Sequence, residues 1–152
     1  MTFSLNISDL DFENIISEQL MNVKTSVQGA MAGRFLELTR ENFGQSGTNR
    51  PIGWENLRSK KYAKRVGRDY ATLFLSGELF DSLKIETSSP DHAAVWTENE
   101  YANTHQWGDE SRNIANRPFM PLYGNAFSSD ISNEAKQHLI EAAQSELERQ
   151  LR

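Results

Sequence analysis

The chain has no cysteine, and its 152 residues contain no apolar run longer than a few residues. Without cysteine, a disulfide framework and thiolate metal sites are excluded, which fits assembly in a reducing cytoplasm. No segment approaches the ~20 apolar residues that a membrane span requires. The start, Met1 to Ser4, lacks the basic and apolar regions of a signal peptide. We therefore expect neither secretion nor membrane insertion.

Apolar residues are scarce, at 38% of the chain, against the ~45–50% usual for a globular domain. We expect one domain, residues 1–152, because a chain of ~150 residues can hide about 70% of its unfolded surface. The low apolar share indicates much polar surface, or long elements that complete their burial only in an oligomer. The formal net charge of −5 would repel nucleic acid at long range, which disfavours a protein that recognises a nucleic-acid sequence.

Apolar spacing predicts a long amphipathic helix from about Asp9 to Asn42, or ~50 Å at 1.5 Å per residue. Ser8 is the expected N-cap, and Asp11 stands at the third helical position as in a capping box. Gly29 and Gly33 interrupt the pattern at ~1 kcal/mol each relative to alanine. We expect a kink or local break there, with a contact face for another backbone as the alternative.

The remaining segments are shorter, and together they predict an α+β fold. The expected elements are a loop (Gly44 to Pro51), a basic helix (Ser59 to Arg68), a turn or short helix (Leu73 to Leu83), two strands (Leu83 to Thr87 and Ala93 to Thr97), a short helix (Tyr101 to Trp107), a polar loop (Gly108 to Asn116) and a C-terminal helix beginning at Ser129 or Asp130. The pattern indicates a small antiparallel sheet flanked by a long N-terminal helix and a C-terminal helix.

Residues suited to catalysis or metal binding are few. The three histidines lie in separate segments without ligand spacing, so no metal site is predicted. His105 is the best candidate for function because it stands beside Gln106 and Trp107, but a packed histidine whose ring nitrogens meet backbone groups is the simpler interpretation. Ser76-Gly77 lacks the earlier glycine of a nucleophile elbow. We expect no enzyme activity and no cofactor; a small hydrolase using His105 with a nearby carboxylate is the weakest hypothesis.

Six positive charges lie within eleven residues of an otherwise acidic chain: Arg58, Lys60, Lys61, Lys64, Arg65 and Arg68. Three interpretations stay open: a solvated face, a patch that docks on an acidic partner subunit, and a patch that lines a DNA passage. If copies stand in a ring, the field of this patch adds up around it although one subunit is net negative. A nucleic-acid-binding accessory protein that uses this segment is the alternative function.

Four short clusters follow one another in the middle of the chain. They are Gly53-Trp54-x-x-Leu57, Leu75-Ser76-Gly77-x-Leu79-x-x-Ser82-Leu83, Tyr101-Ala102-x-x-His105-Gln106-x-Gly108 and Arg117-Pro118-Phe119. In this order they resemble the phage virion morphogenesis proteins, also called tail completion proteins, of Mu-like contractile-tailed phages. Two positions depart from that pattern: Ala115 stands where a proline is usual, and Trp107 replaces a phenylalanine.

The resemblance implies a structural subunit at the phage head–tail junction, acting in a homomeric ring as a tail completion, tail terminator or neck protein without catalytic residues. The implied partners are other copies of the chain and phage head-completion or tail-tube proteins, with non-specific contact to passing DNA as a further option. The protein would be assembled in the host cytoplasm and reside in the virion. The clusters suit core and interface packing equally. The predicted structural anchors are Trp54, Ser76, Gly77, Tyr101, His105, Gln106, Trp107, Gly108, Arg117, Pro118 and Phe119.

Overall fold

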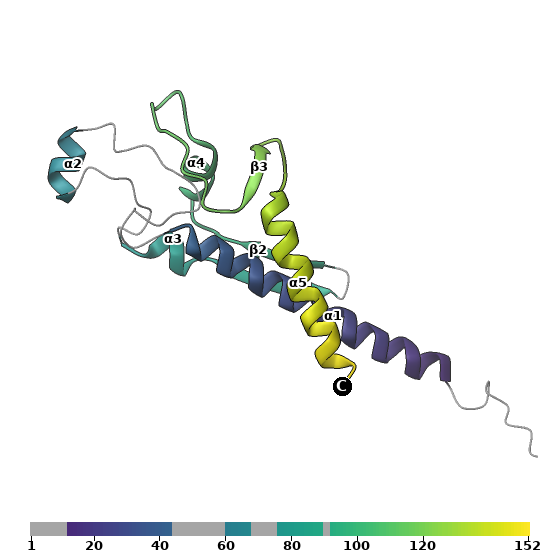
Figure 1. Cartoon of the computed structure of the whole chain (residues 1–152). Helices are drawn as coiled ribbons and strands as arrows, with labels where there is room; N and C mark the ends of the chain where they lie inside the picture. Colours follow the sequence, from purple (N-terminus) through teal and green to yellow (C-terminus); the bar gives the residue numbers. More distant parts are fainter. Residues whose placement is uncertain (1–11, 44–59, 68–75, 90–91) are drawn as a thin grey trace, which may run out of the picture.

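The computed structural model describes residues 12–43, 60–67, 76–89 and 92–152 (Figure 1). Helix α1 (Phe12–Glu41) has 30 residues, or about 45 Å at 1.5 Å per residue, and its N-terminal end extends past the other elements (Figure 1). It runs through Gly29 and Gly33 without interruption, so the expected local break is wrong. A Cβ at either glycine would meet nothing within 4 Å, so neither glycine permits a close backbone approach within the described part of the chain. The expected cap at Ser8 lies outside the described residues.

Strands β1 (Lys84–Ser89) and β2 (His92–Trp96) form an antiparallel hairpin that packs along α1. Ile85 lies opposite Val95, and the pairing becomes irregular between Glu86 and Ser89. The sequence predicted both strands, with bounds one or two residues away from those observed. Ser89 still pairs with His92, so the pairing extends beyond both predicted strands.

Helix α5 (Asn133–Gln150) packs against α1 and completes the main body (Figure 1). The residues buried on the two helices are small or unbranched near the backbone: Ala32 and Thr39 on α1, Ala135 and Leu139 on α5. The N-cap is Ser132, whose side chain accepts a hydrogen bond from the backbone N–H of Ala135 at 3.3 Å. The predicted start at Ser129 or Asp130 is wrong, because both residues belong to a strand.

That strand is part of a second hairpin, formed by β3 (Leu122–Asn125) and β4 (Ser128–Ile131), which the sequence did not predict. The two hairpins are separate two-stranded sheets, so the single small sheet that we expected is two. The α+β class, with a long N-terminal helix and a C-terminal helix, is confirmed. Gly124 in β3 has φ +110°, where a Cβ would collide with the facing strand at Ser128.

The core is a small aromatic and aliphatic cluster at the C-terminal end of α1. It contains Phe43, Leu79, Leu83 and Phe119. The ring of Phe43 meets Phe80 edge-on at 5.4 Å and Phe119 at 5.3 Å between centroids. Asn42 donates a hydrogen bond from Nδ2 to the backbone oxygen of Phe119 at 2.7 Å. The end of α1 is thereby fastened to the segment after Pro118.

Three short helices complete the chain. They are α2 (Lys60–Val66), α3 (Glu78–Asp81) and α4 (Ala102–Trp107). Each occurs where the sequence predicted a basic helix, a turn or short helix, and a second short helix. Within the described residues, no helix combines the length and apolar content of a membrane span, and no three histidine, aspartate or glutamate side chains are grouped so that they could hold a metal ion.

Candidate functional site

The Tyr101-to-Gly108 and Arg117-to-Phe119 clusters meet around one buried amide, that of Gln106. Its side chain is 4% exposed. The Oε1 atom accepts hydrogen bonds from the backbone N–H groups of Phe119 at 3.0 Å and Met120 at 2.9 Å, and Nε2 donates to the oxygen of Met120 at 3.1 Å. Buried backbone groups need such partners. Gln106 therefore ties α4 to the segment that places Phe119 in the core, and we call this arrangement the Gln106 clasp.

Backbone contacts close the Gln106 clasp on its other side. The N–H of Arg117 donates to the oxygen of His105, and the N–H of Gly108 donates to the oxygen of Thr104. Gly108 has φ +81° and ψ 177°, a conformation that only glycine adopts readily. A Cβ there would lie 2.9 Å from the nitrogen of Asn116. The glycine in this cluster therefore permits two backbone segments to approach each other.

His105 is half-buried within the clasp. Burial lowers the pKa of its imidazole, and the neighbouring Arg117 charge lowers that pKa further. The Nδ1 atom is buried and meets no hydrogen-bond partner in the described part of the chain, so the expectation that both ring nitrogens meet backbone groups is wrong. The charged group that shifts this histidine is a cation rather than the carboxylate that the hydrolase hypothesis requires. The site favours a neutral, packed imidazole.

The Ser76-Gly77 pair is a cap and turn ahead of α3. Gly77 is buried with φ 84°, and its oxygen accepts the N–H of Asp81 at 2.8 Å. Ser76 is exposed. Further along, the Ser82 hydroxyl donates to the oxygen of Leu79 at 2.8 Å and shares a hydrogen bond with the Thr97 hydroxyl at the end of β2. This cluster thus joins α3 to the first hairpin. Its described serine side chains serve the turn and the helix rather than forming a nucleophile elbow.

The clusters and the elements that they join lie within the range of one family model. A model described as the phage virion morphogenesis family matches residues 9–148. The chain belongs to the phage virion morphogenesis family. No curated protein and no solved structure matches it. The role of this family member is accordingly in the assembly of phage particles.

The remaining predicted anchors of this family member differ in how far they are buried. Phe119 is 1% exposed and belongs to the core, while Trp107 and Pro118 are half-buried. Tyr101 is 61% exposed, so it is not a core anchor and only the interface alternative remains for it. Trp54 lies outside the described residues.

The basic helix α2 presents one cationic face. Lys60, Lys61, Lys64 and Arg65 are all exposed. At 3.6 residues per turn, these four positions cover less than half of the helix circumference. In Figure 1, α2 lies at the end of the molecule opposite the N-terminal end of α1. Arg58 and Arg68, the other two members of the predicted basic segment, lie outside the described residues.

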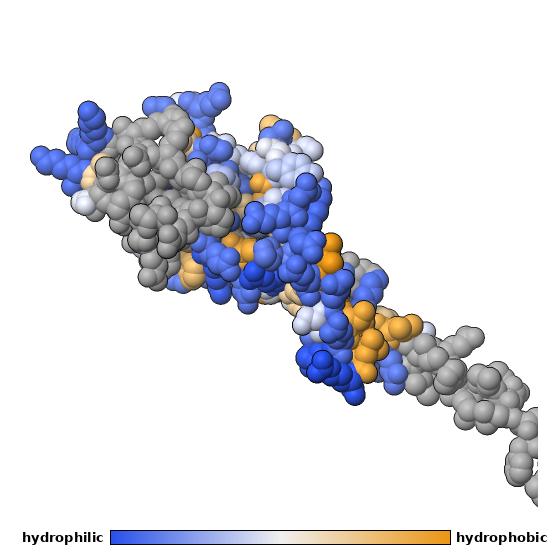
Figure 2. Space-filling view, in the orientation of Figure 1, coloured by the Kyte–Doolittle hydropathy of each residue, from blue (hydrophilic) through white to orange (hydrophobic). Residues whose placement is uncertain are grey.

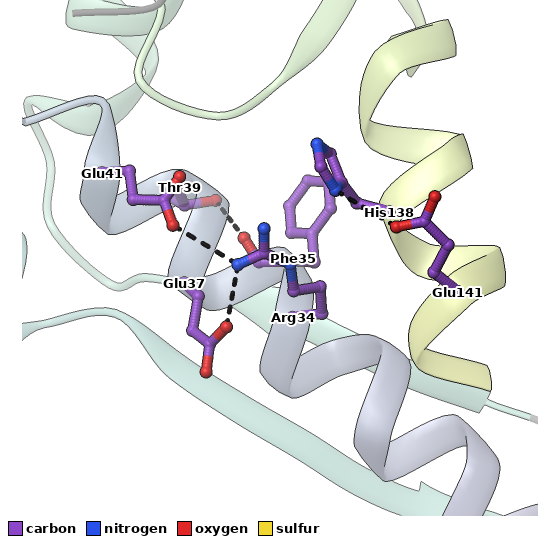
Figure 3. A network of polar contacts seen from close by, with 7 residues as sticks. All are labelled: Arg34, Phe35, Glu37, Thr39, Glu41, His138 and Glu141. Carbon is purple, nitrogen blue, oxygen red and sulfur yellow. Dashed lines mark hydrogen bonds and ion pairs between the residues drawn. The ribbon is translucent and has the colours of Figure 1, made fainter. Parts of the chain in front are cut away.

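A polar network stiffens the C-terminal half of α1 where α5 crosses it (Figure 3). Arg34 donates to Glu37 at 2.9 Å and to Glu41 at 3.3 Å, and the bond to Glu37 is the main cause that raises the Arg34 pKa. The Thr39 hydroxyl donates a hydrogen bond to the backbone oxygen of Phe35 at 2.8 Å. His138 approaches from α5 (Figure 3). These contacts of Arg34 and Thr39 lie within α1, and exposed ion pairs of this kind contribute little energy individually.

Several large apolar side chains in the described part of the chain are exposed. The side chains concerned are Leu20, Met21, Ile85, Tyr101, Tyr123, Phe127, Ile140, Leu147 and Leu151. In Figure 2, apolar surface gathers beside the C-terminal end of α5, over α1. Leu20 is one of the regularly spaced apolar residues of α1, yet it is 64% exposed. The only sequence signal was the low apolar share, which suggested burial completed in an oligomer.

An apolar groove lies between α1, β2 and α5, with a cavity volume of about 360 Å³. We call it the α1–β2–α5 groove. Its lining includes Met31, Ala32 and Phe35 of α1, Ala94 and Val95 of β2, and Leu139 of α5. Ile131, at the base of the second hairpin, closes one side of it. A hydrophobic groove of this kind is typical of a site that receives an apolar side chain.

Proposed function

We propose that this protein is a structural subunit of the phage head–tail junction, that it acts there in a homomeric ring, and that it performs no chemistry of its own. The observation that supports the proposal best is the exposed apolar surface on a member of an assembly family. Leu20, Met21 and Phe127 are 64%, 53% and 101% exposed, while the core cluster holds only four buried residues. Exposed apolar patches of this kind mark protein–protein contacts.

The distribution of surfaces favours a ring over a symmetric dimer. The projecting end of α1 and the basic face of α2 lie at opposite ends of an elongated molecule (Figure 1). Two different surfaces that bind each other make a head-to-tail contact, and such contacts close into rings when the rotation between neighbours permits. Ring formation thus needs only one type of contact, repeated around an axis.

We propose further that the basic face of α2 docks on an acidic partner subunit of the head or tail. The support is its exposure on a chain whose net charge is −5, since that charge disfavours attraction to DNA at long range. Rim charges of this kind act mainly on the association rate and depend on salt.

The decisive experiment uses a phage that cannot make the protein and then adds the purified protein to its heads and tails. Without the protein, full heads and complete tails should accumulate separately in electron micrographs, and adding the purified protein should join them. Joined, infectious particles formed in its absence would contradict the proposal. The four substitutions Lys60→Glu, Lys61→Glu, Lys64→Glu and Arg65→Glu together should block this rescue, whereas Lys60→Arg, Lys61→Arg and Lys64→Arg should not.

A nucleic-acid contact is the second candidate, favoured by the same exposed cationic face. In that case the charge-reversed protein would still join heads to tails, but the particles would eject or retain DNA abnormally. Normal particles with normal infectivity would eliminate both docking and DNA contact, and would leave a solvated face as the explanation of α2.

We also expect the free protein to be monomeric or weakly associated and to order into a ring on its partner, because the low apolar share provides little drive for free association. Light scattering across a concentration series measures this directly. A tight hexamer at low concentration would contradict the predicted weak association but would agree with the proposed ring.

A further inference from the structure

A second pocket, separate from the α1–β2–α5 groove, lies where the end of α1, the start of α5 and the beginning of β3 meet. Its cavity volume is about 210 Å³, and we call it the α1–α5 pocket. Part of its lining is apolar: Leu38 of α1, Pro121 and Leu122 at the beginning of β3, and Ala135 of α5. Neither the Gln106 clasp nor the exposed apolar side chains account for this pocket.

Carboxylates line the α1–α5 pocket from both helices. Glu41 belongs to the last turn of α1 and Glu134 to the first turn of α5. Glu41 shares Arg34 with Glu37, whereas Glu134 is exposed and has no ion-pair partner in the described part of the chain. No lysine or arginine of the described residues lines the pocket, although His138 does, from the α5 side (Figure 3). The two carboxylates therefore favour a cation in this pocket.

Asn42 adds an acceptor in the interior of the pocket lining. Its side chain is 3% exposed, and Nδ2 donates to the backbone oxygen of Phe119 at 2.7 Å. Oδ1 accepts no hydrogen bond within the described residues. The described side-chain atoms that are fully buried without a partner belong to His105 and Arg117, so Oδ1 of Asn42 keeps access to the pocket. A donor that enters the pocket would satisfy this buried amide.

Acceptors beside apolar surface match a cation that carries an apolar stem. An arginine side chain has both parts, since its guanidinium presents five donors in a planar fork at the end of a hydrocarbon chain. A metal ion is a poorer match, because the described residues contain no suitable group of three histidine, aspartate or glutamate side chains. The volume of about 210 Å³ exceeds the roughly 150 Å³ of a cavity that binds benzene, and a guanidinium has fewer heavy atoms than benzene.

The arginines of this chain are poor candidates for the occupant. Within the described residues, every arginine except Arg152 already has a partner in its own chain: Arg34, Arg40, Arg65, Arg112, Arg117 and Arg149. The lysines of α2 end in ammonium groups, which lack the planar fork. The net charge of −5 also favours association with a basic protein. The occupant is therefore expected on a different protein.

We propose that the α1–α5 pocket binds an arginine side chain of a head or tail subunit. Glu134 and Oδ1 of Asn42 accept from the guanidinium, Glu41 adds a second carboxylate, and the hydrocarbon stem covers Leu38 and Leu122. The inference rests on the proposed function because it names the chemistry of the partner at the junction. Arginine is enriched among the residues that dominate protein interfaces, and it binds carboxylates with a defined orientation. The pocket thus fixes how the two subunits meet.

A titration followed by NMR tests the pocket itself. The probe is Nα-acetyl-arginine amide, added to the isotope-labelled full chain at physiological salt. We expect saturable shift changes centred on the side-chain amide of Asn42 and the backbone N–H groups of Leu122 and Ala135. The citrulline analogue is neutral and nearly identical in shape, and it should cause none. Equal binding of the citrulline analogue, or changes that do not gather at the pocket, would overturn the proposal.

Two positions on α5 provide matched variants for this titration. Glu134→Gln should weaken binding of the probe about two- to fivefold, as expected for the loss of one exposed ion pair, and Glu134→Lys should abolish it. Glu148→Gln and Glu148→Lys make the same charge changes at an exposed residue of the same helix outside the pocket lining. Both controls should bind like the unchanged protein. Thermal melts check that all four variants are folded, and unchanged binding by folded Glu134→Lys would refute the site.

Joining of heads to tails identifies the source of the arginine. Protein with Glu134→Lys should fail to join them, whereas protein with Glu148→Lys should succeed. Normal joining by Glu134→Lys would show that no head or tail arginine needs the pocket. A second copy is the other possible source: if Glu134→Lys and Arg152→Gln each abolish self-association of the free protein, the arginine belongs to a neighbouring copy and the inference is wrong.

The titration also separates this inference from the proposed function. Failure of the probe to bind refutes the α1–α5 pocket as an arginine site and leaves the junction role unaffected. Joined, infectious particles formed without the protein refute the junction role, while binding of the probe and its loss in Glu134→Lys remain as measured.

Discussion

In two successive segments of the chain, a side-chain amide oxygen accepts the backbone N–H group of a phenylalanine. One of the two phenylalanine rings is buried and the other is exposed. In the Gln106 clasp, a side-chain amide oxygen accepts the N–H groups of Phe119 and Met120. In the second hairpin, the amide oxygen of Asn125 accepts those of Phe127 and Ser128. Both segments also contain a glycine at positive φ, Gly108 and Gly124. Yet Phe119 is 1% exposed and Phe127 is 101% exposed.

The comparison teaches that a rigid aromatic side chain is useful in two ways. When the support is buried, the ring completes the core and the residues around it serve stability. When the support lies in water, the ring stays available, and its rigidity serves binding because less entropy is lost on docking.

Phe119→Ala should lower the free energy of unfolding by about 3–5 kcal/mol, because it leaves a cavity beside Phe43 in a core of few residues. Phe127→Ala should change it by no more than about 0.5 kcal/mol, since the Phe127 side chain is fully exposed. Urea unfolding of both variants measures the difference. Equal losses would show that Phe127 has a structural role in the isolated chain.

Gln106→Leu should cost about 1–3 kcal/mol for each buried group left without a partner, because it leaves the N–H groups of Phe119 and Met120 without an acceptor. Asn125→Ala should cost less than about 1 kcal/mol, since water can replace an exposed amide. The same denaturation experiment compares them. A larger loss for Asn125→Ala than for Gln106→Leu would contradict the burial that distinguishes the two segments.

Gly108→Ala should destabilise the fold by more than about 1–3 kcal/mol, the usual cost of a strained backbone, because the new Cβ also meets the backbone of Asn116 and Ile114. Gly67→Ala is the matched control: its φ of +73° is also positive, but nothing lies within 4 Å of the added Cβ. The difference in melting temperature between the two variants measures the close approach at Gly108 together with its unusual backbone conformation. No difference would mean that the clasp can open without cost.

The smallest effect concerns pH. Burial and Arg117 hold the pKa of His105 below its ordinary 6.5, so the unfolded chain takes up a proton at this site before the folded chain does. Stability should therefore fall as pH drops below about 6.5, and His105→Gln should flatten that slope. Hydrogen bonds from Ser111 and Arg112 lower the Asp109 pKa to about 2, so stability from this group is lost only below about pH 4, in a separate window. An unchanged slope in His105→Gln would contradict the assignment.

The sequence predicted most of the architecture because long periodic patterns and turn residues carry strong local signals. The stripe of α1, the first hairpin and the short helices around Lys60–Val66 and Ala102–Trp107 all follow from such patterns. The second hairpin did not, since four-residue strands rich in serine, asparagine and aspartate have low strand propensity. Ser129 and Asp130 also resemble helix caps, whereas the true cap, Ser132, comes one turn later.

The interaction surfaces were less predictable because exposure is a property of the whole fold. The cluster Arg117-Pro118-Phe119 marked Phe119, but no local pattern predicted that Phe127 is exposed, and the α1–β2–α5 groove joins residues from segments far apart in the chain. Spacing placed Leu20 on the same stripe as Met31, but only the latter lies against other elements of the main body. Patterns identify which side chains are apolar; the packing of helices and hairpins decides which remain uncovered.

We propose that this family member acts as a ring at the head–tail junction. Cryo-electron microscopy of the joined particle tests it most directly. We predict a closed ring of copies between head and tail. A map of the intact particle in which the protein is absent from the junction would contradict the account.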